Sequence, residues 1–134
     1  MRVVLDTNVF VSGVFFSWPP FRILKAWRDE KIQLAVSPEI LEEYRRVGKI
    51  LAGEHPAIDL DPMLEYVIQN AGRYSAPPLL ERVCDDPDED KFLACALASG
   101  SALVVSGDRH LLKVSGYQNI EVLRPRDFLE KYLQ

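Results

Sequence analysis

Short apolar runs alternate with amphipathic segments along the whole chain. The apolar runs cover residues 2–5, 32–36 and 102–105, with a weaker run at 120–123, and most of them end at polar or turn residues. Such runs are typical of buried parallel strands. The helices predicted by apolar positions at helical spacing lie at residues 21–30, 38–51, from 61 onward, 87–99 and 126–132. This alternation predicts an α/β fold with a mostly parallel central sheet.

The connecting segments carry turn-forming and aromatic residues. Segments 52–60 and 74–80 contain the prolines and glycine that favour loops. Phe15, Phe16 and Trp18 are expected in a loop after the first strand. There they would either be buried in the core or be exposed, where a ring could stack on a nucleic-acid base or contact another protein chain.

Composition limits the kind of protein. The 134 residues, 48% hydrophobic and 27% charged, are enough for one domain with its own core, and we expect a single domain over residues 1–134. No apolar run approaches the ~20 residues of a membrane span. Because a strand begins at once and no secretory signal precedes it, we expect a cytoplasmic protein. Cys84 and Cys95 have no metal-binding spacing and suit reduced, packed thiols. The net charge of −4 argues against a broad basic surface.

Two acidic residues follow predicted strands. Asp6 ends the first strand, and Asp108 lies just past the third. Functional groups of open parallel sheets gather beyond the carboxyl ends of the strands. An acid that closes so apolar a strand would be partly buried, which is costly without a partner or a metal ion. We therefore expect a functional role for both, although Asp108 would also suit the N-cap of a short turn.

A run of five acids and a proline lies at residues 85–90. Asp86 suits an N-cap, Asp88 favours a helix N-terminus, and Glu89 would complete a capping box. Asp90 is left without such a role and borders the apolar face of the helix. We therefore select Asp90 as the functional acid of this run.

The predicted helix at 38–51 supplies a fourth acid. At about 100° per residue, Glu43 lies about 90° from the centre of the apolar face, and Glu42 lies about 170° from it. Glu43 is our choice, because it borders the core, whereas Glu42 should face solvent. A solvated helix face remains the alternative for Glu43.

Four carboxylates from distant segments would repel one another if they met without a cation. A divalent ion resolves this conflict, and hard oxygen ligands suit Mg²⁺ or Mn²⁺. Such ions polarise phosphodiesters and lower the pKa of bound water. Acids committed to metal would also no longer repel a phosphate backbone.

Four motifs in this order resemble those of PIN-domain nucleases. They are Val4–Phe10 (VLDTNVF), Ser37–Val47 (SPEILEEYRRV), Asp85–Ala96 (DDPDEDKFLACA) and Val104–Leu112 (VVSGDRHLL). Each motif is weak alone, but together they are specific and span most of the chain. The chain also looks similar to PIN-family proteins described as toxin components of toxin–antitoxin systems.

The resemblance implies a three-layer α/β/α sandwich and cleavage of RNA that depends on Mg²⁺ or Mn²⁺. Its metal-binding acids carry over onto Asp6, Glu43, Asp90 and Asp108, although both Glu42 and Glu43 fit the second motif loosely. Asn8, Ser106 and Asp86 carry over as supporting residues, of which Asp86 would otherwise be only a cap. The resemblance also implies an antitoxin partner and a homodimer.

Contact with RNA needs positive charge near the acids. The candidate residues follow the acidic motifs along the chain: Arg45, Arg46, Lys49, Arg109, His110 and Lys113. His110 stands where many relatives have a further acid. A solvated surface is the alternative for each of these residues.

Two other functions compete with a metal-dependent endoribonuclease. A PIN-derived module without turnover would bind RNA or protein only. An aspartyl phosphatase would use Asp6 as its nucleophile, but that class requires Asp-x-Asp, and this chain has Asp6-Thr7-Asn8. The sequence leaves open whether the site takes one or two metal ions.

Overall fold

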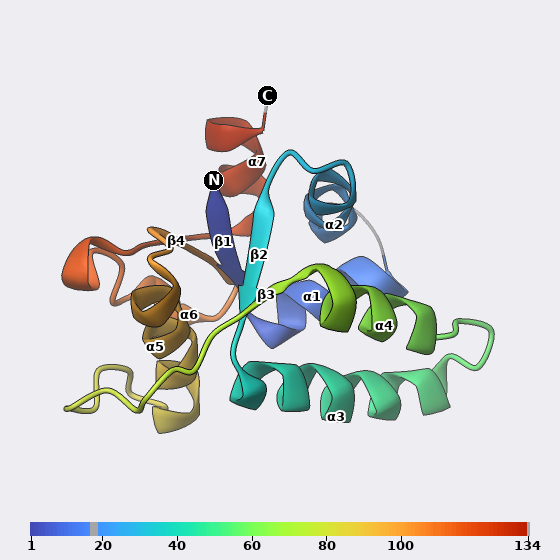
Figure 1. Ribbon diagram of the computed structural model, residues 1–134, viewed down its shortest axis with the longest axis horizontal. Helices are drawn as coiled ribbons and strands as arrows, with labels where there is room; N and C mark the ends of the chain where they lie inside the picture. Colours follow the sequence, from blue (N-terminus) through green and yellow to red (C-terminus); the bar gives the residue numbers. More distant parts are fainter. Residues whose placement is uncertain (17–18, 134) are drawn as a thin grey trace.

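Five parallel strands form the centre of the molecule. The computed structural model describes residues 1–16 and 19–133, and Trp18, expected above in a loop, lies outside them. The strands are β1 (Arg2–Leu5), β2 (Gln33–Val36), β3 (Gly72–Arg73), β4 (Leu103–Val105) and β5 (Glu121–Leu123). Their order in the sheet is β3-β2-β1-β4-β5, so the first strand of the chain lies in the middle (Figure 1).

Helices cover the sheet on both faces. In the described residues they are α1 (Thr7–Phe15), α2 (Pro20–Arg28), α3 (Pro38–Glu54), α4 (Asp61–Asn70), α5 (Asp90–Ser99), α6 (Arg109–Leu112) and α7 (Pro125–Tyr132). The connections move outward from β1 to β2 and β3 and then return to β4. Because parallel crossovers are right-handed, this reversal places α5 on the face opposite α1 and α2. The predicted α/β class with a parallel sheet and three layers is confirmed.

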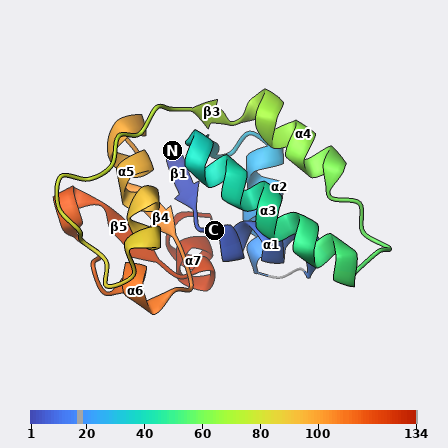
Figure 2. The same cartoon turned by 90° about the horizontal axis from the view of Figure 1, so that it is seen from below.

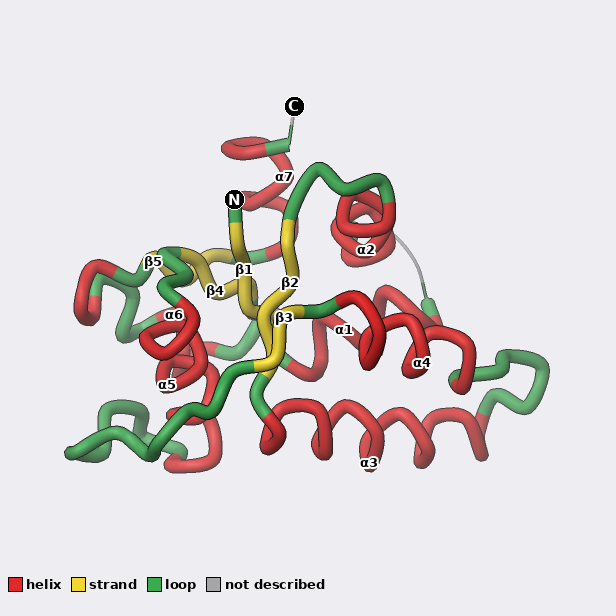
Figure 3. Tube along the Cα trace, in the orientation of Figure 1, coloured by secondary structure: helices red, strands yellow, loops and turns green. Residues whose placement is uncertain are grey.

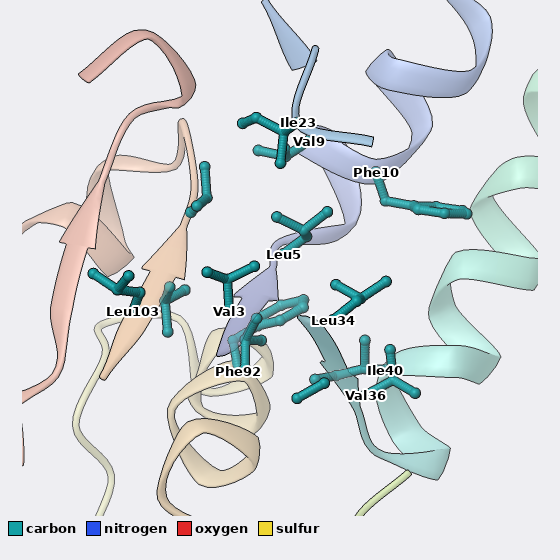
Figure 4. Packing of buried hydrophobic residues seen from close by; sticks show 14 of the residues in the cluster. Val3, Leu5, Val9, Phe10, Ile23, Leu34, Val36, Ile40, Phe92 and Leu103 are labelled. Atoms are coloured by element: carbon teal, nitrogen blue, oxygen red, sulfur yellow. The ribbon is translucent and has the colours of Figure 1, made fainter. Parts of the chain in front are cut away.

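The buried apolar side chains of the strands and helices form one continuous core. Figure 4 shows Val9, Ile23 and Phe92, from α1, α2 and α5, around Val3 and Leu5 of β1. The ring of Tyr44 on α3 stacks on Phe10 with centroids 4.2 Å apart. None of the described helices is long and apolar enough to cross a membrane.

Helices α3 and α4 extend the molecule beyond the sheet, where they lie side by side in two views (Figures 1 and 2). Gly48 of α3 packs against Leu60, the residue just before α4, and an added Cβ at Gly48 would lie 2.6 Å from Leu60 Cδ2. A long loop then leads from β3 to the segment that begins α5 (Figure 3). Helix α5 ends at Gly100, whose φ of 69° supplies the expected left-handed C-cap.

Several predicted boundaries were wrong. Residues 7–15 form α1, so Phe15 lies in a buried helix rather than in a loop, and Phe16 is exposed at its end. This helix is apolar on most sides because most of it is buried, and it therefore lacks the periodicity of a surface helix. The predicted helix 87–99 divides into a 3₁₀ turn (Pro87–Glu89) and α5. The two-residue strand β3 was not predicted, since it is too short to show alternation.

Candidate functional site

The candidate site lies at the carboxyl ends of β1 and β4. These neighbouring strands are paired at Leu5 and Val105, and their connections leave in opposite directions, to β2 and to β5. Such a switch in strand order opens a crevice in a parallel sheet. Asp6 follows β1 and Asp108 lies just beyond β4, so the topology brings the two acids to this crevice.

Asp6 is a buried carboxylate with only 3% of its surface exposed. The Ser106 hydroxyl donates a hydrogen bond of 2.6 Å to Asp6 Oδ2 and accepts one of 2.9 Å from the backbone N–H of Asp108. Burial raises the pKa of Asp6 from 3.8 to about 6, against the lowering effect of the Ser106 hydrogen bond. The negative charges of Asp108 and Glu43 raise this pKa further. Ser106 therefore supports both strand-end acids.

Asp108 also caps α6, as its alternative role predicted. Its Oδ1 accepts a hydrogen bond of 2.7 Å from the backbone N–H of His110. The side chain is half-buried, and its charge raises the pKa of both Asp6 and Glu89. Asp108 thus both caps α6 and belongs to the acidic cluster.

Glu43 and Glu42 lie in different environments on α3. The Glu43 side chain is 17% exposed, whereas that of Glu42 is 54% exposed and pairs with Arg45. Thr7 Oγ1 donates a hydrogen bond to Glu43 Oε2, and Lys91 Nζ lies 2.7 Å from Oε1. The Tyr44 hydroxyl donates to the Leu5 carbonyl at 2.5 Å, which ties this turn of α3 to the end of β1. Glu43 therefore faces the acidic cluster and Glu42 faces solvent.

Both side-chain oxygens of Asp90 accept hydrogen bonds from the backbone of the preceding loop. Its Oδ2 accepts from the N–H of Val83 at 3.0 Å, and its Oδ1 accepts from the N–H of Cys84 at 2.7 Å. Both oxygens thus hold the end of the long loop against the start of α5.

Glu89 is the acid that the sequence analysis missed. Within the part of the chain that the structure describes, its buried Oε2 has no hydrogen-bond partner. Burial raises the pKa of Glu89 from 4.5 to about 8, and the negative charges of Asp6, Asp108 and Glu43 raise it further. Glu89 thus shares its electrostatic environment with the other three acids.

The sequence held a signal for Glu89. It precedes Phe92 by three residues, Leu93 by four and Ala96 by seven, so it continues the buried stripe of α5 toward the site. The expected capping box concealed this pattern. The structure forms only half of that box: Asp86 Oδ1 accepts from the Asp88 N–H at 3.0 Å, whereas Glu89 Oε2 has no hydrogen-bond partner within residues 1–16 and 19–133.

The basic candidates surround this site unevenly. Lys113 Nζ lies 3.1 Å from Asp85 Oδ2 and His110 Nδ1 lies 4.0 Å from the same oxygen, while Arg46 Nη2 lies 3.7 Å from Glu43 Oε1. Residues exposed to solvent are Asn8, Arg45, Lys49 and Arg109. A cleft of about 340 Å³ adjoins the site and is lined by the loop before α5 together with Lys91 and Arg82.

The donor set fits a divalent cation. As the side chains stand, no three His, Cys, Asp or Glu residues in the described ranges are arranged to hold a metal ion. However, Glu89 presents a buried oxygen that has no partner among the described residues. The charges of Asp108 and Glu43 raise the pKa of Asp6, and those of Asp6, Asp108 and Glu43 raise the pKa of Glu89. Oxygen ligands of this kind suit Mg²⁺ or Mn²⁺, whose charge would remove the repulsion.

A parallel α/β sheet with carboxylates gathered at its switch point defines the class of this protein. A family model described as PIN domain matches residues 2–110. The chain belongs to the PIN domain family. PIN domains are generally nucleases, which act on nucleic acids and usually use divalent metals. A search of curated proteins gave no significant match.

Proposed function

We propose that this PIN domain is a metal-dependent endoribonuclease that hydrolyses RNA phosphodiester bonds. The observation that carries the proposal is the buried Glu89 Oε2, which has no hydrogen-bond partner in the described part of the chain and lies beside the charges of Asp6, Glu43 and Asp108. A buried carboxylate without a hydrogen bond is costly unless a cation approaches it. The acids would therefore serve to hold Mg²⁺ or Mn²⁺.

Asp6, Glu43, Glu89 and Asp108 are the residues that we propose as ligands. Asp90, predicted from the sequence, holds the loop amides instead and stays a second candidate for the third acid. A bound divalent ion would supply a water of lowered pKa and positive charge opposite the phosphate.

The remaining residues prepare the site for this chemistry. Ser106 orients Asp6 by donating a hydrogen bond to its Oδ2, and Thr7 orients Glu43 by donating one to its Oε2. Asn8 and Asp86 are proposed as supporting groups at the ends of their helices. The cleft beside Lys91 and Arg82 offers cations to the RNA backbone. Arg45, Lys49 and Arg109 would extend this positive rim.

The resemblance of the four motifs supports a more specific role. We propose a cytoplasmic toxin that a cognate antitoxin neutralises, and a homodimer as its assembled form. Co-purification with the product of an adjacent gene and light scattering of the pure protein would test these two parts.

Cleavage of a labelled RNA tests the central proposal. The EDTA-treated protein is dialysed and incubated with end-labelled single-stranded RNA or DNA, with and without Mn²⁺ or Mg²⁺. We expect cleavage of RNA only with metal, and its loss in Asp6→Asn and Glu43→Gln. Glu42→Gln is the matched control, because it makes the same change one residue away on the solvent side.

Other outcomes would identify other functions. Activity retained in Asp6→Asn would refute the proposed site. Binding of RNA without metal-dependent cleavage would favour a silent binding module, cleavage of DNA alone would exclude a ribonuclease, and a phosphoryl-aspartate trapped at Asp6 would identify a phosphatase.

A further inference from the structure

Lys91 forms an ion pair that joins α3 and α5 across the acidic cluster. Its Nζ lies 2.7 Å from Glu43 Oε1, and the two side chains are only 23% and 17% exposed. The residues are 48 positions apart in sequence, so the pair depends on the fold rather than on local helix geometry.

Helix energetics give no reason for a lysine at this position. Lys91 is the second residue of α5, and a cation is unfavourable at a helix N-terminus, where the helix dipole is positive. Burying part of its charge adds a further cost. The gain that offsets both costs lies in the neighbouring carboxylates, of which Glu43 is in direct contact.

Arg46 is a second cation near Glu43 Oε1, but its side chain is much more exposed to solvent than that of Lys91. Arg46 Nη2 lies 3.7 Å from Glu43 Oε1, but the Arg46 side chain is 60% exposed. Solvent screens this pair strongly. Lys91 is closer and more buried, so its positive charge contributes more to the electrostatics of the cluster.

We infer that Lys91 is the built-in counter-ion of the acidic cluster and that it competes with the divalent cation for Glu43. This inference deepens the proposed function and rests on it. In the metal-free protein, the ammonium group offsets part of the repulsion among the carboxylates. A divalent ion must displace Lys91 from Glu43 and approach against its positive charge. Lys91 is therefore a positioning residue that sets the metal concentration at which the site fills.

Lys91→Met tests this inference, with Arg46→Met as the matched control. Each variant removes one cation from the same carboxylate oxygen and keeps an unbranched side chain. Mn²⁺ affinity is measured without RNA, from the free-ion signal in electron paramagnetic resonance. Thermal melting in EDTA reports the metal-free protein.

We expect opposite effects on the two measurements. Lys91→Met should bind Mn²⁺ about tenfold more tightly, which corresponds to about 1.4 kcal/mol, and should melt at a lower temperature in EDTA. Arg46→Met should change affinity less than about twofold, because its pair is exposed. Lys91→Arg, which keeps the charge, should restore weaker Mn²⁺ binding and the melting temperature.

A purely structural ion pair would behave differently, since its loss would weaken the metal site as well as the fold. Unchanged or weaker Mn²⁺ binding by Lys91→Met therefore overturns the inference, while Mn²⁺ binding and RNA cleavage by the wild type would leave the proposed function standing. Absence of Mn²⁺ binding by the wild type would refute both. If Lys91→Met does not fold, Lys91→Gln decides in the same assays.

Discussion

The adjacent acids Glu89 and Asp90 should respond in opposite ways to the loss of their charge. Glu89→Gln removes a half-buried carboxylate whose Oε2 has no partner in the described structure. Asp90→Asn removes a carboxylate that accepts two backbone hydrogen bonds, at 3.0 and 2.7 Å. In metal-free protein, we therefore expect Glu89→Gln to raise stability and Asp90→Asn to lower it.

The magnitude for Glu89 follows from its pKa, which burial raises from 4.5 to about 8. When the pKa of a carboxyl group is higher in the folded protein than in the unfolded chain, the group favours the folded state fully only at a pH below the unfolded pKa. This contribution is lost as the pH rises from 4.5 toward 8. After discounting for solvent screening of a half-buried group, the loss at pH 7.5 is about 2 kcal/mol. Removal of the charge should therefore raise the melting temperature by about 4–8 °C.

Asp90 has the opposite balance. A hydrogen bond to a charged group contributes about 1.5–3 kcal/mol, and the amide of Asn would face one loop N–H with its own N–H₂ group. We expect Asp90→Asn to lose about 2–3 kcal/mol, a decrease of about 5–10 °C in melting temperature. The variant should keep its stabilisation by Mn²⁺, whereas Glu89→Gln should lose most of it.

Thermal melting of both variants in EDTA and in Mn²⁺, at pH 7.5 and at pH 4.5, provides the assay. The Glu89→Gln gain should shrink at pH 4.5, because the unfolded chain then also carries much of the proton that the folded wild type holds on Glu89. If Glu89→Gln destabilises the protein while Asp90→Asn removes the Mn²⁺ response, then Asp90 rather than Glu89 is the third ligand.

Three further predictions concern buried groups. Because burial raises the pKa of Asp6 from 3.8 to about 6, metal-free stability should fall by about 3 kcal/mol as the pH rises through this window. Denaturant titrations should show this fall flattened in Asp6→Asn, and an unchanged slope would refute it. Tyr44→Phe leaves the Leu5 carbonyl without its 2.5 Å donor and should cost about 1–3 kcal/mol by urea unfolding; no loss would mean that water replaces the hydroxyl. Burial raises the pKa of both Cys84 and Cys95 to about 12, so a thiol reagent at pH 8 should react with them only at the rate of unfolding.

The fold was largely predictable because its signals are local. Runs such as residues 3–5 and 103–105 are apolar throughout, as strands buried on both faces must be. Gly100 ends its helix by a conformation that favours glycine. The failures have physical causes too: α1 is buried on most sides and shows no amphipathic period, and β3 has only two residues.

The site was less predictable, because it depends on contacts between distant segments. Asp6 and Asp108 could be selected, since the carboxyl end of a parallel strand is itself a functional position. The choice between Glu89 and Asp90 could not be made in this way. This choice depends on whether the backbone amides of Val83 and Cys84 reach Asp90. The spacing of apolar residues along the sequence does not show that a loop folds back onto the start of a helix.

The hydrogen bond from Ser106 to Asp6 also bears on how the protein becomes active during its synthesis. These residues are 100 positions apart, and the central strand β1 leaves the ribosome long before its partner β4. Contacts of such large sequence separation form late and slowly. Until then Asp6 has neither its hydrogen-bond donor nor the neighbouring Asp108. A nascent chain that ends before β4 therefore contains three of the four proposed acids and part of the sheet, but it lacks Asp108 and the strand that completes the site. The synthesis of this nuclease fold is thus separated from the onset of its chemistry.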